Sequence, residues 1–401
     1  MFKQRFKIIG LTEDSFSENE DIIRDEIEKV VIGTVFSGGK RHYDIVKGIL
    51  PDKHRWIEIG RSIENTLNQY AAEKNILIFA SGDPLFFGIG ETIIREFPEA
   101  EVEIKPYLNS LQLLASKIML PYGKMKTVSL TGRSWGDFDS SLIRGEDMIG
   151  ILTDRKKTPR TIAERMMAYG YDNYRFNIGE NLGSKEEKIY KGLNINDVIS
   201  HDYVSPNCLI IEKIQKRAIH FGIPDNDFSI LEGRPNMITK MPARLLDIAL
   251  LELGNKHTLW DIGFCTGSIS IEAKLRFPHL QIIAFEKRKE CEKLMLENVK
   301  KFRTPGIETV IGDFLEIDLS QYPVPDAIFL GGYGGDLNKM ISTIRSVIKS
   351  ETTIVFNSVS EKSRSEFIKY SNENGMKVTA EYHLTVDNHN PLTILQVKWE
   401  C

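Results

Sequence analysis

One strand-to-helix turn limits most strongly what this chain can fold into. Residues 259–272, Leu-Trp-Asp-Ile-Gly-Phe-Cys-Thr-Gly-Ser-Ile-Ser-Ile-Glu, begin as an apolar strand that ends at Asp261 and continue into a helical pattern. Gly263 and Gly267 lie in the turn, where glycine lets backbone amides approach a nucleotide-like ligand because no Cβ stands in the way. The pattern indicates a parallel α/β sheet with a ligand at its carboxyl edge, although a βα turn that binds nothing looks the same.

Two features of this turn favour S-adenosylmethionine (SAM) over a dinucleotide. The acid Asp261 comes early, at the strand end, and Cys265 replaces the central glycine of the dinucleotide fingerprint. A carboxylate there suits the cationic sulfonium and amino group of SAM better than it suits an anionic pyrophosphate. A dehydrogenase-like site is the main alternative.

Three further strand ends follow in chain order, each with glycine or an acid. The run 281–286 reads as a buried strand that ends in a carboxylate, and in doubly wound folds such a carboxylate accepts hydrogen bonds from ribose hydroxyls. The next strand ends at a Gly-Asp pair from which a carboxylate can reach adenine. The fourth runs into a glycine-rich turn. The sequence therefore predicts a SAM site at Asp261, Gly263, Gly267, Glu286, Gly312, Asp313 and Gly331.

Composition sets wider limits. Hydrophobic residues make up 41% of the chain and charged residues 27%, which is typical of a globular protein. The formal net charge of -4 gives no general basic field, so nucleic-acid binding is not expected. The cysteines are scattered without metal-ligand spacing, so no metal site is expected. No apolar run approaches the ~20 residues that span a bilayer, and the basic start lacks a signal-peptide core, so we expect a cytoplasmic protein without a membrane partner.

A chain of 401 residues is too long for one ordinary core, which indicates more than one domain. We predict an N-terminal domain over residues 1–215, a linker over residues 216–235 and a second domain over residues 236–401. The linker assignment depends on the turn-forming residues Gly222, Pro224, Asp225, Gly233 and Pro235.

Two local patterns predict specific elements. Asp83 can cap a helix and Pro84 suits its first turn, so a helix is expected to begin there. Near the end of the chain, the strands 378–385 and 392–399 follow one another directly. They predict an antiparallel hairpin on an otherwise parallel sheet, as in class I methyltransferases.

Three motifs in the first half resemble those of the tetrapyrrole (corrin/porphyrin) methylases, and more narrowly the branch that methylates carbon 5 of the ring. They are Ser81-Gly-Asp-Pro-Leu-Phe-Phe-Gly-Ile-Gly90, Val128-Ser-Leu-Thr-Gly-Arg133 and Ile178-Gly-Glu-Asn-Leu-Gly183. The resemblance implies two α/β subdomains, about residues 1–106 and 107–215. It also implies a SAM site with Gly82, Asp83, Pro84 and Ser110.

The second half resembles the partner family, which methylates carbon 15 and removes a carboxylate. The similar segments are Glu232-Gly-Arg-Pro-Asn-Met-Ile-Thr-Lys240, the turn at Asp261, and Pro325-Asp-Ala-Ile-Phe-Leu-Gly-Gly332. This resemblance implies a class I Rossmann-like SAM methyltransferase domain after the tetrapyrrole-methylase fold. It adds Thr239, Thr266 and Lys287 to the SAM site.

Fused in this order, nearly the whole chain resembles the precorrin methyltransferases of cobalamin biosynthesis. That resemblance implies methylation of a precorrin or cobalt-precorrin ring at carbons 5 and 15, with decarboxylation of the ring C acetate. It also implies a homo-oligomer, a dimer or tetramer.

The chain departs from the family pattern mainly in its first half. Gly10-Leu-Thr-Glu-Asp14 stands where the family has a Gly-x-Gly-Pro-Gly loop, and Pro106-Tyr-Leu-Asn-Ser110 replaces Pro-Gly-x-Ser-Ser. We expect the N-terminal domain to be active but to use its first loop differently. The carboxylates of that loop should point away from a polycarboxylate substrate or meet a cation such as Lys40 or Arg41.

The chemistry expected of a methyl transfer demands positioning more than acid–base groups, because the reaction is an in-line displacement at a sulfonium methyl. The carboxylates of a tetrapyrrole need Arg or Lys, and its ring needs apolar or aromatic walls. Candidates for substrate binding are Arg133, Lys240, Arg244 and Tyr333. No catalytic residue is assigned. The substrate's own conjugated ring accepts the electrons of decarboxylation, so that part of the pocket should be relatively apolar.

Two other functions fit parts of the sequence. One is an RNA or protein methyltransferase with an accessory N-terminal domain. Against it, the fourth strand ends in Gly331-Gly332 rather than in the Asn/Asp-Pro-Pro-aromatic motif used for exocyclic amines. The other is a non-catalytic corrinoid-binding sensor, which the departures in the N-terminal half permit.

Overall fold

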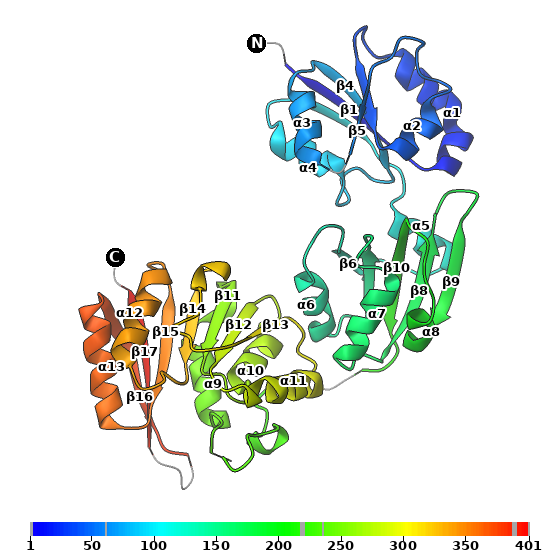
Figure 1. Ribbon diagram of the computed structural model, residues 1–401. Coiled ribbons are helices and arrows are strands. Elements are labelled where there is room, and N and C mark those ends of the chain that lie inside the picture. The colour runs from blue at the N-terminus through cyan, green and yellow to red at the C-terminus, as the bar shows by residue number, and fades with distance from the viewer. Residues whose placement is uncertain (1–2, 61, 217–220, 235, 387–390, 400–401) are drawn as a thin grey trace. The chain divides into compact units, whose positions relative to one another are not determined.

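The computed structural model describes residues 3–60, 62–216, 221–234, 236–386 and 391–399 (Figure 1). The chain divides into two compact units. Unit 1 comprises residues 1–133, 147–163 and 174–212, and unit 2 comprises residues 134–146, 164–173 and 213–401. The domain boundaries that the sequence suggests, at residues 215 and 236, stay predictions.

The first sheet of unit 1 has five strands in the order β3-β2-β4-β1-β5, all parallel. The central strand β4 is buried on both faces, and it accordingly reads as a continuous apolar run rather than an alternating one. The strands are β1 (Arg5–Leu11), β2 (Val35–Gly38), β3 (Trp56–Glu58), β4 (Asn75–Ser81) and β5 (Glu101–Lys105). The helices of this part are α1 (Glu13–Glu28), α2 (Lys40–Val46), α3 (Ile63–Ala71) and α4 (Ile89–Glu96).

A second sheet follows along the chain with five strands in the order β6-β7-β10-β8-β9, and it mixes parallel and antiparallel pairs. Its strands are β6 (Lys126–Ser129), β7 (Met148–Leu152), β8 (Tyr174–Glu180), β9 (Lys188–Leu193) and β10 (Asn207–Lys213). The same stretch of chain forms the helices α5 (Ser110–Ile118), α6 (Gly136–Arg144), α7 (Pro159–Ala168) and α8 (Ile195–Ile199). Two α/β sheets in succession agree with the tetrapyrrole-methylase fold.

Unit 2 contains a seven-stranded sheet in the order β13-β12-β11-β14-β15-β17-β16. Its strands are β11 (Thr258–Ile262), β12 (Gln281–Glu286), β13 (Ile307–Ile311), β14 (Ala327–Leu330), β15 (Thr353–Ser358), β16 (Met376–Leu384) and β17 (Leu392–Trp399). The first five are parallel, and β17 pairs antiparallel with both β15 and β16. This confirms the expected class I Rossmann-like domain and its antiparallel terminal hairpin.

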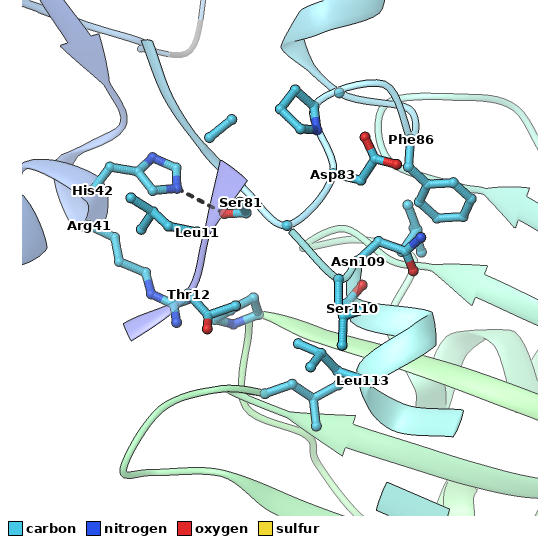
Figure 2. Close-up of a pocket in the computed structure, with 18 of the residues that line it drawn as sticks. Leu11, Thr12, Arg41, His42, Ser81, Asp83, Phe86, Asn109, Ser110 and Leu113 are labelled. Carbon is cyan, nitrogen blue, oxygen red and sulfur yellow. Dashed lines mark hydrogen bonds between the residues drawn. The ribbon is translucent and has the colours of Figure 1, made fainter. Parts of the chain in front are cut away.

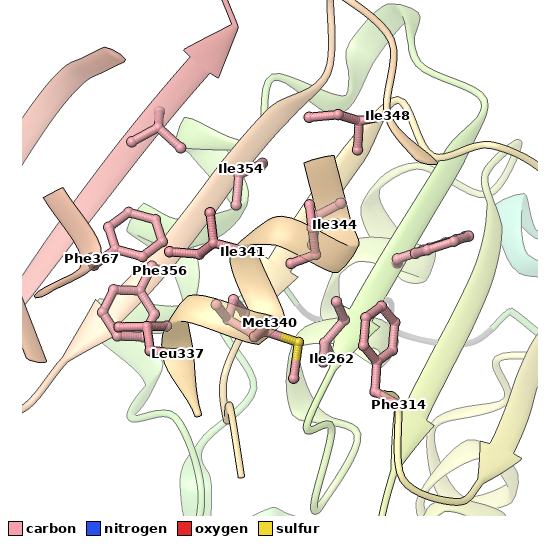
Figure 3. Packing of buried hydrophobic residues seen from close by; sticks show 14 of the residues in the cluster. Ile262, Phe314, Leu337, Met340, Ile341, Ile344, Ile348, Ile354, Phe356 and Phe367 are labelled. Atoms are coloured by element: carbon pink, nitrogen blue, oxygen red, sulfur yellow. The ribbon is translucent and has the colours of Figure 1, made fainter. Parts of the chain in front are cut away.

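The helices of this domain are α9 (Met241–Leu250), α10 (Ser268–Arg276), α11 (Glu290–Phe302), α12 (Leu337–Val347) and α13 (Glu361–Glu373). Figure 3 shows α12 on one face of the sheet, where Leu337, Met340, Ile341 and Ile344 pack on side chains of β11 and β15. Those four residues fall at positions i, i+3, i+4 and i+7, which places them on one side of the helix. Side chains on this face of the parallel strands are thereby covered.

The segment before α9 is part of the core of unit 2. Ile223 and Phe228 are 2% and 4% exposed, and they pack with Ile238 and with residues of the β11–α10 turn. Glycine and proline were the signals for a linker here. They instead mark bends of a packed strap (residues 221–234 and 236–240), whereas residues 217–220 and Pro235 lie outside the described residues.

The helix predicted to begin at Asp83 and Pro84 begins later. The Leu85 amide donates to Asp83 Oδ1 at 2.9 Å, and the chain then turns until α4 starts at Ile89. A Cβ on Gly88 or Gly90 would lie within 2.8 Å of the Pro84 carbonyl oxygen, so the turn packs against its own backbone. The predicted start of the helix was therefore wrong by five residues.

In the described part of the chain, no helix has the length and apolar character needed to cross a bilayer.

The packing of the strap predicts a difference between two fragments. Fragment 236–401 lacks Ile223 and Phe228, and burial of side chains of this size contributes about 1.5–3 kcal/mol each. It should be less stable than fragment 221–401 by roughly 3–6 kcal/mol in urea denaturation. Neither fragment contains residues 134–173, so the comparison isolates the contribution of the strap. Equal urea-denaturation midpoints for the two fragments would contradict the placement of the strap in the core of unit 2.

Candidate functional sites

A cavity of about 680 Å³ opens at the carboxyl ends of the parallel strands in unit 2. The ends of β11, β12, β14 and β15 contribute to it, which is where the strand-end pattern of the sequence predicts a ligand. Of the residues predicted to bind SAM in this half, those that line it are Thr239, Asp261, Gly263, Thr266, Glu286, Lys287, Gly312, Asp313 and Gly331.

Gly263 allows the turns after β11 and β14 to touch. Its φ is +80°, and a Cβ there would lie 2.7 Å from the Gly332 amide nitrogen. Gly267, also predicted to bind SAM, is not among the residues that line the cavity. Its φ is +74° and its added Cβ would lie 2.3 Å from Met295 Sδ, so this glycine is needed for packing against α11.

The Glu286 carboxylate is held in place from two directions. The Cys265 amide donates to Oε2 at 3.1 Å, and the Arg288 amide donates to Oε1 at 3.0 Å. The Arg288 guanidinium adds a contact at 3.2 Å. The side chain is 3% exposed, yet it borders the cavity, so a fixed carboxylate faces any ligand there.

Asp261 is buried and only partly satisfied. The amide and hydroxyl of Ser270 donate to Oδ2 at 3.2 and 2.5 Å, while Oδ1 has no hydrogen-bond partner among the described residues. Burial, with a smaller contribution from the neighbouring Glu286, raises the pKa of Asp261 to about 7. An unpaired buried acceptor costs about 1–3 kcal/mol, which a ligand that donates a hydrogen bond would recover.

Lys287 and Asp313 form an ion pair at the rim of the cavity, with 2.7 Å between Nζ and Oδ2. The hydrogen bond between them raises the pKa of Lys287 and lowers the pKa of Asp313. Asp313 was predicted from its strand end, and Lys287 from the family resemblance. The ion pair between Lys287 and Asp313 joins the loops that follow β12 and β13 at the carboxyl edge of the sheet.

Two of the three substrate candidates of this half, Lys240 and Tyr333, line the cavity. Arg244 does not, and this prediction is wrong. Its side chain is 0% exposed and its Nε donates to Glu272 Oε2 at 3.1 Å. The Arg244 guanidinium also donates to the carbonyls of Thr239 and Ile223. It therefore joins the strap to α10 and cannot reach a substrate.

Sequence reasoning missed part of the cavity wall. Asn357 lines it from the end of β15, and a search of strand ends that included amides as well as glycine and acids would have found it. Leu384 and Leu392 come from the terminal hairpin, where no local pattern shows which residues face the cavity. They make this side of the cavity apolar.

A second cavity, of about 420 Å³, lies within unit 1 (Figure 2). It is lined by all four residues predicted to bind SAM in this half: Gly82, Asp83, Pro84 and Ser110. Arg133, predicted to bind substrate, is exposed and is not among the lining residues. Its guanidinium lies 4.9 Å from the ring centroid of Phe87, which does line the cavity, so Arg133 contacts the cavity wall through Phe87.

Backbone segments come into close contact at Gly82, which lines this cavity. A Cβ on Gly10 would lie 1.8 Å from the Gly82 carbonyl oxygen, and one on Gly82 would lie 2.9 Å from the Leu108 carbonyl oxygen. Gly82 also has a φ of +60°. Glycine at these two positions is what lets the ends of β1 and β4 and the loop before α5 meet.

The segment over residues 10–14, which departs from the glycine-rich loop of the family, leads into the start of helix α1. Thr12 caps α1: its Oγ1 accepts from the Ser15 amide at 3.1 Å, and Ser15 Oγ accepts from the Thr12 amide at 2.7 Å. Glu13 and Asp14 lie in the first turn of α1, where carboxylates favour the helix dipole. Glu13 shares a hollow with Lys40 and Arg41. The predicted pairing with these cations stays a prediction.

Two family models match the chain, one for each half. The model of tetrapyrrole (corrin/porphyrin) methylases matches residues 17–194, and the model of the precorrin methyltransferase domain matches residues 233–397.

Curated relatives agree with this division. Precorrin-6Y C(5,15)-methyltransferase [decarboxylating] of Sinorhizobium sp is 28% identical over 356 residues, which are 88% of this chain and 84% of the relative. Cobalt-precorrin-7 C(5)-methyltransferase of Salmonella typhimurium is 29% identical over 166 residues, 41% of this chain and 80% of the relative. Cobalt-precorrin-6B C(15)-methyltransferase (decarboxylating) of the same organism is 37% identical over 115 residues, 29% of this chain and 58% of the relative.

The buried contacts of Arg244 predict a large effect on stability. In Arg244→Leu, Glu272 keeps its charge without a cationic partner, and breaking a buried pair in this way costs about 3–5 kcal/mol. Urea denaturation should show that loss for unit 2. The control Lys293→Leu removes an exposed cation 3.9 Å from Glu297 and should cost less than about 1 kcal/mol. Equal losses would show that Arg244 is not a buried structural residue.

The raised pKa of Asp261 predicts a pH dependence with a definite sign. From about pH 4 to about pH 7 the native protein keeps a proton on Asp261 that the unfolded chain releases, so Asp261 makes unfolding easier as the pH rises. Asp261→Asn should flatten this part of the dependence of unfolding free energy on pH. If wild type and variant have the same slope over that range, the carboxyl is ionised in the native protein.

Proposed function

We infer the function from the family: the chain belongs to the precorrin methyltransferases, with a tetrapyrrole methylase domain and a precorrin methyltransferase domain in one polypeptide. We propose that it methylates carbons 5 and 15 of a precorrin or cobalt-precorrin ring in cobalamin biosynthesis. We also propose that it decarboxylates the ring C acetate. One observation carries the proposal: each family region has its own cavity, and each cavity is lined by residues of that family's motifs. Two methylations at different carbons call for two methyl-transfer sites.

The C-terminal cavity suits SAM. Glu286 is fixed where it can accept hydrogen bonds from ribose hydroxyls, and Asp313 follows the next strand, in reach of an adenine. The unpaired Oδ1 of Asp261 suits a cationic amino group. When bound, SAM supplies an electrophilic methyl group. The chain's own part is to hold that group and the substrate carbon in line, a positioning effect worth up to about 7–11 kcal/mol.

The remaining wall of the same cavity suits a tetrapyrrole. Lys240 offers a cation to a ring carboxylate, and Tyr333 offers an aromatic face. Leu384 and Leu392 supply an apolar surface. A departing carboxylate is best placed against such a surface, because a cation held against it would stabilise the charged form and oppose its loss.

The localisation, the oligomeric state and the partners are inferred from the family. We expect a cytoplasmic homo-oligomer, a dimer or tetramer, without a nucleic-acid partner. The relatives named above all act on precorrins by their names, so they give no support to an RNA or protein methyltransferase or to a non-catalytic sensor.

Removal of the fixed carboxylate tests the C-terminal site. Glu286→Ala should weaken SAM binding to this site by roughly 1–3 kcal/mol, since charge-assisted hydrogen bonds to the ligand are lost. Calorimetric titration of the full chain measures it, with circular dichroism to confirm folding. Glu308→Ala removes an exposed carboxylate on β13 and serves as the control. Unchanged affinity in a folded Glu286→Ala protein would remove Glu286 from the site.

A further inference from the structure

His42 and Ser81 form a hydrogen-bonded pair on the wall of the N-terminal cavity. His42 lies in the first turn of α2 and Ser81 is the last residue of β4, and 2.9 Å separates His42 Nε2 from Ser81 Oγ. Figure 2 shows the His42 ring turned toward Ser81, with Arg41 and Thr12 nearby and with Asn109 and Ser110 across the cavity.

The hydrogen bonds of His42 determine which ring nitrogen carries the proton. The Gly39 amide donates to Nδ1 at 3.1 Å, so Nδ1 is an acceptor and has no hydrogen. The ring proton is therefore on Nε2, which donates to Ser81 Oγ. Burial, and then the charge of Arg41, lower the pKa of His42 to about 4, so the ring is neutral at physiological pH. Nε2 already carries a hydrogen and Nδ1 is occupied by the Gly39 amide, so in this arrangement neither ring nitrogen is free to accept a proton, and the ring instead orients the Ser81 hydroxyl.

The orientation leaves the Ser81 hydroxyl as a donor. Its oxygen already accepts from His42, so its hydrogen must point to another acceptor. Within the described residues the structure gives that hydrogen no partner, and Ser81 is exposed to the cavity. Its O–H is thus available to a ligand.

A cation lines the same cavity as this donor. This cation is Arg41, and among the described residues its guanidinium has no ion-pair partner. Asp83, an acid that lines this cavity, accepts from the Leu85 amide. Glu13 and Asp44 lie in a separate hollow that Arg41 also borders. Much of the rest of the wall is apolar, with Ile45, Ile59, Phe79 and Leu113. A hydroxyl donor and a guanidinium on an otherwise largely apolar wall suit one chemical group, a carboxylate.

We propose that Ser81 and Arg41 form a carboxylate-binding subsite of the N-terminal cavity, and that His42 is the positioning residue that fixes the Ser81 hydroxyl as a donor. The subsite rests on the proposed carbon-5 methylation. Its carboxylate has two sources with the same chemistry, a side chain of the tetrapyrrole or the methionine portion of SAM.

Ser81→Ala in the full chain is the first test. If the tetrapyrrole supplies the carboxylate, the KM for tetrapyrrole in carbon-5 methylation should rise about tenfold, the effect of one lost charge-assisted hydrogen bond, while kcat changes little. If SAM supplies it, the Kd of S-adenosylhomocysteine should rise about tenfold instead, and decarboxylated SAM should bind wild type and variant equally. The Glu286→Ala background separates this site from the C-terminal one.

Variants of His42 separate positioning from mere packing. His42→Ala should reproduce the change seen in Ser81→Ala, whereas His42→Gln should recover much of it, because the amide offers one acceptor to Gly39 and one donor to Ser81. His201→Ala replaces an exposed histidine away from the cavity and should change neither constant.

Two outcomes would overturn the subsite. In one, Ser81→Ala and His42→Ala leave both the KM for tetrapyrrole and the Kd of S-adenosylhomocysteine unchanged. In the other, only kcat falls, which would place Ser81 in the chemical step. A wild-type protein that does not methylate carbon 5 would contradict the proposed function instead. Calorimetric titrations of tetrapyrrole and of S-adenosylhomocysteine would then still test the subsite.

Discussion

The close approach of the turns after β11 and β14 is the constraint on which the C-terminal site depends. Gly263 meets Gly332 with no room for a Cβ on Gly263, and this contact extends the parallel pairing of the two strands into the loops beyond them. Because β12 lies on the other side of β11, the same register brings Glu286 beside the turn at Cys265. Side chains from distant parts of the sequence thus border one cavity.

The two cavities use the same physical device. In unit 1, Gly10 and Gly82 let two parallel strand ends and the following loop approach backbone to backbone, as Gly263 does in unit 2. Glycine loses more conformational entropy on folding than residues with a Cβ. Its presence at these points therefore indicates that close backbone approach matters more there than local stability. Around these points each cavity offers a few polar groups on a largely apolar wall, which suits a large conjugated ring with carboxylates.

The sequence predicted well what depends on local pattern. The strands of unit 2 and the residues at their ends could be placed because a buried parallel strand reads as a short apolar run, and its carboxyl end then falls at the edge of the sheet. Arg244 was misassigned because its partner Glu272 lies 28 residues away, on α10, and only packing brings them together. No sequence pattern indicated the roles proposed for His42 and Arg41 in a carboxylate subsite, since they depend on the pairing of β2 with β4.

The central claim is that one chain carries two methyl-transfer sites, one of which also removes carbon dioxide. Mass spectrometry of a precorrin-6B-type or cobalt-precorrin substrate, incubated with SAM and the full chain, tests it most directly. The account predicts a product heavier by two methyl groups and lighter by one carbon dioxide. A product with one added methyl group and no loss of carbon dioxide, or an unchanged substrate, would contradict it.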